Sequence, residues 1–265
     1  MKRSIGRLVG IMLIVVVMGI LIAKTYYDKQ NRSVDPRVVP ARELYEGYNA
    51  YARTGNYHQV FALLDSIGQI YRGIPHYSHS FELGVLENNR AASLITIALY
   101  GDSIPKARNP MHDVSSDSLL SLAEDHVRKA IGLYERWNDA YAGLARDEIR
   151  EKIRGEFMQG LDPADPDQNA AYLEARIDEI LEALEENKRR LSVCYTNLGL
   201  VCRMQGEYES AVKHYEHAIA LWERNLDAEN NLNKLLNRPL KKRNFIQRMF
   251  PPSKEISPQQ QNQMQ

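Results

Sequence analysis

Apolar residues recur every three or four positions along most of the chain, which is the spacing of one face of an α-helix. The pattern is clearest over residues 195–222, where Gln205, Gly206 and Glu207 separate two apolar stripes. Glycine can adopt the left-handed conformation that ends a helix because it has no Cβ atom to clash. The segment is therefore predicted to form a hairpin of two antiparallel helices.

Small and bulky residues occupy fixed places within this hairpin. The small side chains allow the two backbones to approach closely, and the larger ones fill the space around them. The pattern resembles the signature of the tetratricopeptide repeat (TPR) family. The residues that carry the resemblance are Leu198, Gly199, Gly206, Tyr208, Ala211, Tyr215 and Ala218. The resemblance implies an all-α fold of TPR-like antiparallel helical hairpins stacked as a short α-solenoid.

A degenerate copy of the same pattern lies near the start of the domain. Tyr51, Gly55 and Tyr57 stand at the spacing of three corresponding residues in the clearer hairpin. In this family the first helix of each hairpin lines a concave face that holds a peptide or helix of a protein partner. The resemblance thus nominates four binding residues, which are Asn49, Arg53, Asn197 and Arg203.

The middle of the chain is expected to be helical as well. Residues 81–99 form an apolar-periodic run that is predicted to be a second hairpin, and further helices are expected over residues 119–134 and 137–158. Two prolines interrupt residues 160–166, and neither glycine nor proline recurs until Gly199. One long helix is therefore predicted to run from residue 169 into the hairpin, followed by a capping helix over residues 225–237.

These patterns divide the chain into six segments. The segments are residues 1–30, a membrane anchor; 31–40, a linker; 41–160, degenerate helical repeats; 161–168, a second linker; 169–238, the long helix with the TPR hairpin and the capping helix; and 239–265, a tail that is basic and then Gln-rich, where we expect disorder.

Residues 8–23 are uncharged and nearly all aliphatic, and basic residues flank them on both sides. This pattern favours an N-terminal transmembrane helix, whose slight shortfall against the ~30 Å bilayer core can be absorbed by snorkelling of Arg7 and Lys24. A cleaved signal peptide is the second interpretation, because Ala23 can precede a cleavage site. The short basic N-terminus favours a single-pass protein of the bacterial inner membrane, with its C-terminal domain in the periplasm.

The charge balance and the cysteines exclude several classes of protein. Lys and Arg together number 34, equal to Asp and Glu, so the composition gives no reason to expect nucleic acid as a partner. The only cysteines are Cys194 and Cys202. Their Cα atoms would lie about 12 Å apart on one helix, too far for a disulfide bond. We expect two free, buried thiols.

No motif of catalysis or of metal binding stands out. The closest histidine pairs, His76 with His79 and His214 with His217, have no thiolate or HExxH arrangement nearby. No phosphate-binding glycine loop or nucleophile elbow is present. We therefore expect no cofactor, no metal and no enzymatic activity, although a hydrolase or metal-dependent enzyme built from the irregular loops is the alternative from another functional class.

A basic stretch near the C-terminus invites a separate hypothesis. Lys241, Lys242, Arg243 and Arg248 are interleaved with apolar residues and no acidic residue interrupts them. The stretch is either a contact for an anionic membrane surface or acidic partner, or a solvated tail.

The sequence favours a membrane-anchored helical-repeat scaffold or adaptor that mediates protein–protein interactions in a membrane-associated complex. The alternative within the same fold is a chaperone-like or targeting accessory of a protein translocation or secretion machinery. Such an accessory would bind many unfolded clients weakly, whereas a scaffold would hold particular partners.

Overall fold

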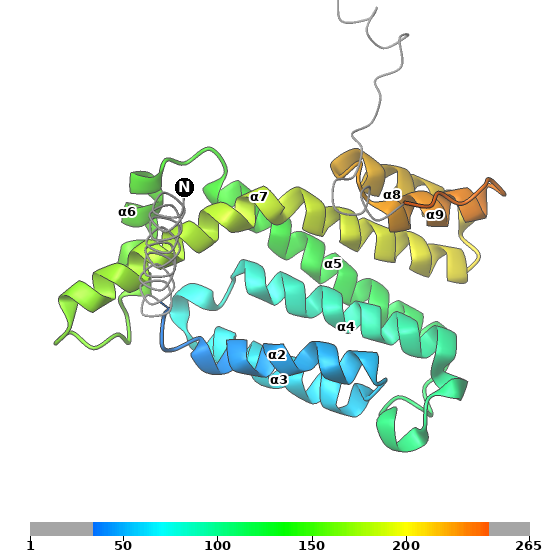
Figure 1. Cartoon of the computed structure of the whole chain (residues 1–265), viewed down its shortest axis with the longest axis horizontal. Coiled ribbons are helices and arrows are strands. Elements are labelled where there is room, and N and C mark those ends of the chain that lie inside the picture. Colours follow the sequence, from blue (N-terminus) through cyan, green and yellow to red (C-terminus); the bar gives the residue numbers. More distant parts are fainter. Residues whose placement is uncertain (1–33, 244–265) are drawn as a thin grey trace, which may run out of the picture.

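The computed structural model describes residues 34–243, and all regular secondary structure within that range is helical (Figure 1). The α-helices are α2 (Val39–Arg53), α3 (Tyr57–Gly73), α4 (Phe81–Tyr100), α5 (Ser116–Tyr141), α6 (Arg146–Phe157), α7 (Pro166–Met204), α8 (Tyr208–Leu221) and α9 (Leu226–Leu235). Three short 3₁₀ turns, η1 (Pro75–Tyr77), η2 (Gly101–Ser103) and η3 (Lys106–Arg108), complete the set.

The predicted transmembrane segment, residues 8–23, lies outside the described residues, as does Arg248. Among residues 34–243, no helix combines the length and the apolar character that crossing a bilayer requires.

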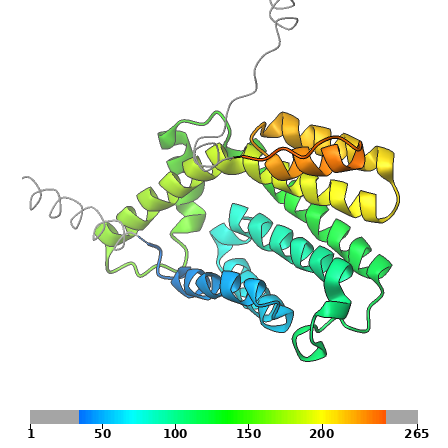
Figure 2. The same cartoon turned by 45° about the vertical axis from the view of Figure 1, so that its right-hand side comes forward.

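The helices form a stack of hairpins in which successive members pack side by side (Figures 1 and 2). Helix α2 pairs with α3, α4 with α5, and α7 with α8, and α9 covers α8. Neighbouring hairpins touch through α3 with α4 and through α5 with α7. The described part of the chain is thus all-α, consistent with the TPR-like fold expected from the sequence.

Glycine closes the turns of the first and last hairpins as predicted. Gly55 has a φ of +64° and Gly206 a φ of +82°, a region that side chains with a Cβ atom rarely adopt. Asn56 caps α3 by accepting a hydrogen bond from the backbone of Gln59. The turn and the cap therefore fix the point at which α2 gives way to α3.

In each of two hairpins, a glycine on one helix packs closely against a tyrosine ring on the other helix. A Cβ atom placed on Gly199 of α7 would lie 2.6 Å from the ring of Tyr215 on α8. A Cβ atom on Gly84 of α4 would lie 2.7 Å from the ring of Tyr134 on α5. The same packing of glycine against tyrosine thus joins the two helices of the clear repeat and the two helices of the hairpin before it.

The middle of the chain differs from the sequence-based expectation. Residues 81–99 form one helix, α4, rather than a hairpin, and its partner α5 continues past Trp137 to Tyr141. Aromatic packing explains why α5 continues past Trp137. The ring centroid of Phe81 on α4 lies 4.7 Å from that of Tyr134 and 6.2 Å from that of Trp137. The expected helix over residues 137–158 is therefore split between the end of α5 and the separate helix α6.

The long helix predicted from residue 169 is observed as α7, which has 39 residues. Its first half extends past the stack of hairpins and packs against α6, which lies between α5 and α7 in the chain (Figure 1). Arg146 and Arg150 of α6 both form ion pairs with Glu174 of α7. Helix α6 is therefore an insertion into the row of hairpins, fastened to α7 at the surface.

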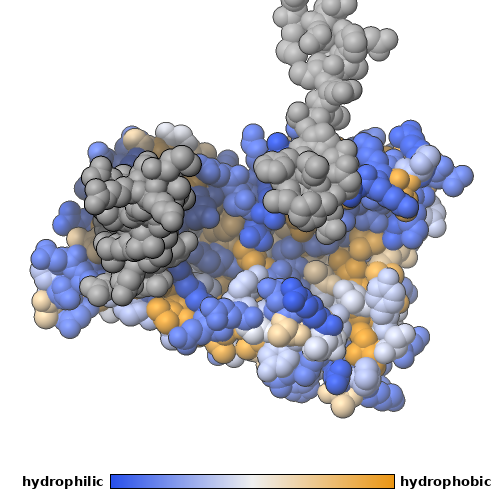
Figure 3. Space-filling model, in the orientation of Figure 1, coloured by the Kyte–Doolittle hydropathy of each residue, from blue (hydrophilic) through white to orange (hydrophobic). Residues whose placement is uncertain are grey.

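Most of the predicted repeat residues are buried, but Gly206 in the turn and Tyr208 after it are exposed. Leu198, Ala211, Tyr215 and Ala218 are at most 1% exposed, whereas Tyr208 is 59% exposed at the start of α8. On the face drawn in Figure 3, apolar residues reach the surface only in separate patches among hydrophilic ones. The apolar stripes of the helices are therefore largely used between the hairpins.

Because Gly199 and Gly84 touch tyrosine rings, the changes Gly199→Ala and Gly84→Ala should each lower the free energy of unfolding by about 1–3 kcal/mol. The matched control is Gly155→Ala in α6, since a Cβ atom there meets nothing within 4 Å. Alanine also favours a helix over glycine, so the control should be neutral or slightly stabilising. Chemical denaturation of the three variants measures this, and equal effects at all three positions would contradict the close packing.

Candidate functional site

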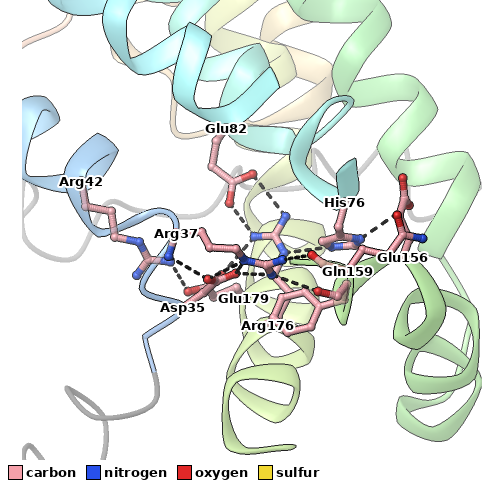
Figure 4. Close-up of polar contacts among 10 residues, drawn as sticks. Asp35, Arg37, Arg42, His76, Glu82, Glu156, Gln159, Arg176 and Glu179 are labelled. Carbon is pink, nitrogen blue, oxygen red and sulfur yellow. Dashed lines mark hydrogen bonds and ion pairs between the residues drawn. The ribbon is translucent and has the colours of Figure 1, made fainter. Parts of the chain in front are cut away.

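A cluster of charged residues surrounds Arg176 of α7, which is buried with only 2% of its surface exposed (Figure 4). Its guanidinium donates hydrogen bonds of 2.6 Å to Glu82 of α4 and 3.0 Å to Glu179 one turn further along α7. Its Nε donates to Nε2 of His76 over 3.2 Å. The cation also lies 4.2 Å from the ring centroid of Tyr77. Arg176 therefore connects α7 to α4 and to η1.

Glu82 and Arg176 are both charged at neutral pH. Burial alone would raise the pKa of Glu82, but the charge of Arg176 and its hydrogen bonds outweigh burial and hold that pKa at about 2. The side chain of Glu82 keeps 27% of its surface exposed, so its carboxylate is not wholly removed from water. Burial likewise opposes the charge of Arg176, and the attraction of Glu82 raises the pKa of Arg176 well above its ordinary value.

His76 is the neutral member of the cluster. Burial and the adjacent charge of Arg176 lower the pKa of His76 to about 3. Since Nε2 accepts a hydrogen bond from Arg176, the ring proton is assigned to Nδ1, which faces Glu156 at 4.0 Å. The imidazole thus acts as a hydrogen-bond acceptor for a buried cation and carries no charge at neutral pH.

A second arginine fastens the segment before α2 to the end of α6. Arg37 forms an ion pair of 2.7 Å with Asp35 and donates hydrogen bonds to the carbonyl oxygens of Phe157 and Gln159. Its guanidinium also lies 5.0 Å from the ring centroid of Phe157. The donors of the cluster are directed at partners within the chain, which indicates that these residues position helices.

A groove opens beside this cluster, where the hairpins meet. Its cavity has a volume of about 190 Å³. The lining residues are Tyr45 of α2, Ile67 and Tyr71 of α3, Glu82, Val85 and Leu86 of α4, and Arg190 of α7. Most of the lining side chains are apolar or aromatic, and Glu82 and Arg190 are the charged ones. Such a cleft is suited to an apolar side chain accompanied by a polar or charged group.

Two buried polar atoms on this part of α7 have no hydrogen-bond partner among the described residues. They are Nε of Arg190, which lines the groove, and Oδ1 of Asn187, one turn earlier. Arg190 also has an ion pair with Glu186, but the separation is 3.9 Å. Unpartnered buried groups are uncommon in folded proteins, and of these two atoms only Nε of Arg190 belongs to a residue that lines the groove.

The structure does not bring the four predicted binding residues together. Asn49 and Arg53 are exposed on α2. Asn197 donates a 2.9 Å hydrogen bond to Asn88 of α4, whereas Arg203 donates a 3.3 Å bond to Asn231 of α9. Six positions on a helix correspond to a rotation of about 240°, so Asn197 and Arg203 face different neighbours. They are half-buried and bonded within the chain rather than displayed on one free surface.

The groove residues were not identified from the sequence. Tyr45, Leu86 and Arg190 come from three helices, and no local spacing relates them. Arg176 gave a weak signal, because it stands beside Ile177 of the apolar stripe in a helix rich in charged residues. That position alone does not show which carboxylate pairs with it.

The predicted basic surface is partly neutralised where the structure describes it. Lys241 forms a 2.9 Å ion pair with Glu229 of α9, and Arg243 lies 3.7 Å from the same carboxylate. The backbone of Lys241 also bonds to the side chain of Asn230. Residues 241–243, placed in the tail by the sequence, thus run back against α9, and of these three cations only Lys242 has no such contact.

Both cysteines are buried and neither is part of a disulfide bond, as predicted. Burial raises the pKa of Cys194 to about 12, so its thiol is not a nucleophile at neutral pH. Within residues 34–243, no group of three or more histidine, cysteine, aspartate or glutamate side chains is arranged to hold a metal ion.

Comparison with known proteins agrees with the repeat pattern in one segment. Residues 172–224 match the model of the tetratricopeptide repeat family. This range covers most of α7 and all of α8, including the contact between Gly199 and Tyr215. No curated protein and no solved structure matches the chain.

The low pKa of His76 predicts a pH-dependent stability. As the pH falls from about 6.5 toward 3, the unfolded chain binds a proton at His76 that the folded chain does not, so stability is lost in that window. Between pH 7 and pH 5 the native chain should lose about 2 kcal/mol more than a His76→Gln variant, which keeps an acceptor for Arg176.

Urea denaturation at the two pH values measures this difference. The matched control is His79→Gln, which removes an exposed histidine three residues away and leaves His76 in place. A pH dependence that survives in His76→Gln would show that His76 is not held neutral in the folded chain.

Proposed function

We propose, from the tetratricopeptide repeat at residues 172–224, that this chain is a membrane-anchored scaffold that holds a segment of a protein partner in the groove between α2, α4 and α7. Repeats of this type typically bind proteins, and stacked helical hairpins provide extended surfaces for doing so. The observation that carries the proposal is the unpartnered Nε of Arg190 in the wall of a cleft whose other lining residues are apolar or aromatic except for Glu82.

The chemistry of the groove defines the partner segment. Tyr45, Val85 and Leu86 offer contacts for an apolar side chain. Arg190 offers a guanidinium that can donate two parallel hydrogen bonds to a carboxylate. The segment should therefore carry an apolar residue next to an acidic residue or a C-terminal carboxylate. A lysine in place of Arg190 would retain the charge but lose the paired geometry.

The location of the scaffold is a further part of this proposal. The apolar run over residues 8–23 supports an anchor in a membrane, and the basic residues before it support export of the C-terminal domain to the bacterial periplasm. In this arrangement the groove would be held beside the bilayer, within reach of membrane-associated partners.

A photo-crosslinking amino acid in place of Val85 tests the groove in isolated membranes. The expected result is one discrete adduct with a partner protein, which stays with the membrane after an alkaline carbonate wash. The change Arg190→Gln should reduce the yield of this adduct by about tenfold, the worth of a charge-assisted hydrogen bond.

The same cross-linker at Leu122 provides the control, because this side chain is 41% exposed on α5 and does not line the groove. It should give no discrete adduct. Equal adducts from both positions would indicate non-specific capture, and the absence of an adduct at Val85 would move the binding surface elsewhere. Release of the chain by carbonate would contradict the membrane anchor but would leave the groove as the proposed binding site.

A further inference from the structure

A second cavity lies between α3, α4 and α5, on a different face of α4 from the groove. Its volume is about 280 Å³. The residues that line it are Arg72, Ser78, Leu83, Glu87, Arg128, Lys129, Gly132, Leu133 and Arg136. Four of these side chains are cationic and one is a carboxylate, in a chain whose total charge is balanced. Cations are therefore concentrated at this cavity.

The charges of the cavity are only partly neutralised within the chain. Glu87 already receives a 2.5 Å hydrogen bond from His126 and lies 3.8 Å from Arg72. Arg128 is held by Glu124 over 2.6 Å. Among residues 34–243, neither Lys129 nor Arg136 has a carboxylate within ion-pair distance, although the charge of Lys129 contributes to lowering the pKa of Glu87. Lys129 and Arg136 therefore lack a direct ion pair and can contact an anion from outside.

Glycine leaves room for two of the arginine side chains at the cavity. A Cβ atom on Gly68 would lie 3.1 Å from a guanidinium nitrogen of Arg72, and one on Gly132 would lie 3.2 Å from a guanidinium nitrogen of Arg136. In both cases the glycine precedes the arginine by one helical turn. The guanidinium groups therefore lie back over bare backbone, at the cavity rather than away from it.

We propose that this cavity is a binding site for a phosphoryl group, and that Lys129 and Arg136 supply the principal contacts. A phosphoryl group carries close to two negative charges at neutral pH and three acceptor oxygens. This matches two unpaired cations with several donors better than a single carboxylate does. The ligand is either a free phosphate compound or the headgroup of a phospholipid, which present the same chemistry to these residues.

Isothermal titration of the full chain in non-ionic detergent, at constant ionic strength, tests the site with inorganic phosphate. Saturable binding is expected. The double change Lys129→Gln with Arg136→Gln should weaken binding by about tenfold or more, because charge-assisted hydrogen bonds are lost. The control Lys213→Gln with Lys234→Gln removes the same charge elsewhere and should leave binding unchanged.

The change Gly132→Ala separates binding from folding. The added Cβ atom would lie 3.2 Å from the guanidinium of Arg136 and shift it slightly from its position over Gly132, whereas alanine in place of glycine favours the helix. Weaker phosphate binding without a lower melting temperature is the expected result. Undetectable phosphate binding by the native chain, or equal weakening in the two double variants, would overturn the proposal.

A parallel titration with short-chain, water-soluble phosphatidic acid distinguishes the two sources of the ligand. Similar affinities for phosphatidic acid and inorganic phosphate would indicate that the site reads the phosphoryl group alone. About tenfold tighter binding of phosphatidic acid, again lost in Lys129→Gln with Arg136→Gln, would assign the site to a lipid headgroup.

Discussion

The arrangement of the hairpins depends on the contacts that the buried guanidinium of Arg176 makes with its partners. A buried charge is tolerated only where partners satisfy it, and removing one partner of such a pair typically costs about 3–5 kcal/mol. The partners of Arg176 come from α4, from η1 and from α7 itself. The chain can satisfy this cation only when the first half of α7 lies against the second hairpin. Arg176 thus specifies the packing of a helix that extends beyond the repeat.

The same contact shapes the groove. Glu82 binds Arg176 and also lines the groove, together with Leu86 and Arg190. Because Glu82 and Arg176 tie α4 to α7, this ion pair restrains two of the helices that line the groove. A preorganised cleft loses less conformational entropy on binding, which favours a scaffold that holds a particular segment over one that adapts to many clients.

The sequence predicted what depends on neighbours along the chain. The hairpin around Gly206, the turn at Gly55 and the length of α7 follow from helical spacing and from glycine, and the structure confirms them. The pairing of α4 with α5 could not be predicted from the sequence, because a long connection separates the two helices that carry Gly84 and Tyr134. The partners of Asn197 and Arg203 were missed for a similar reason, since they lie on α4 and α9. Local periodicity identifies an apolar face but not the helix that covers it.

A double-mutant cycle between Arg176 and Glu82 tests most directly whether this buried pair holds the hairpins as one body. The cycle compares the free energies of unfolding of Glu82→Gln, Arg176→Met and the double variant with that of the native chain. We predict that each single variant is strongly destabilised and that the double variant recovers much of the loss, giving a coupling energy of about 2 kcal/mol or more. Additive effects, with a coupling near zero, would show that the pair of Arg176 and Glu82 does not hold the hairpins together.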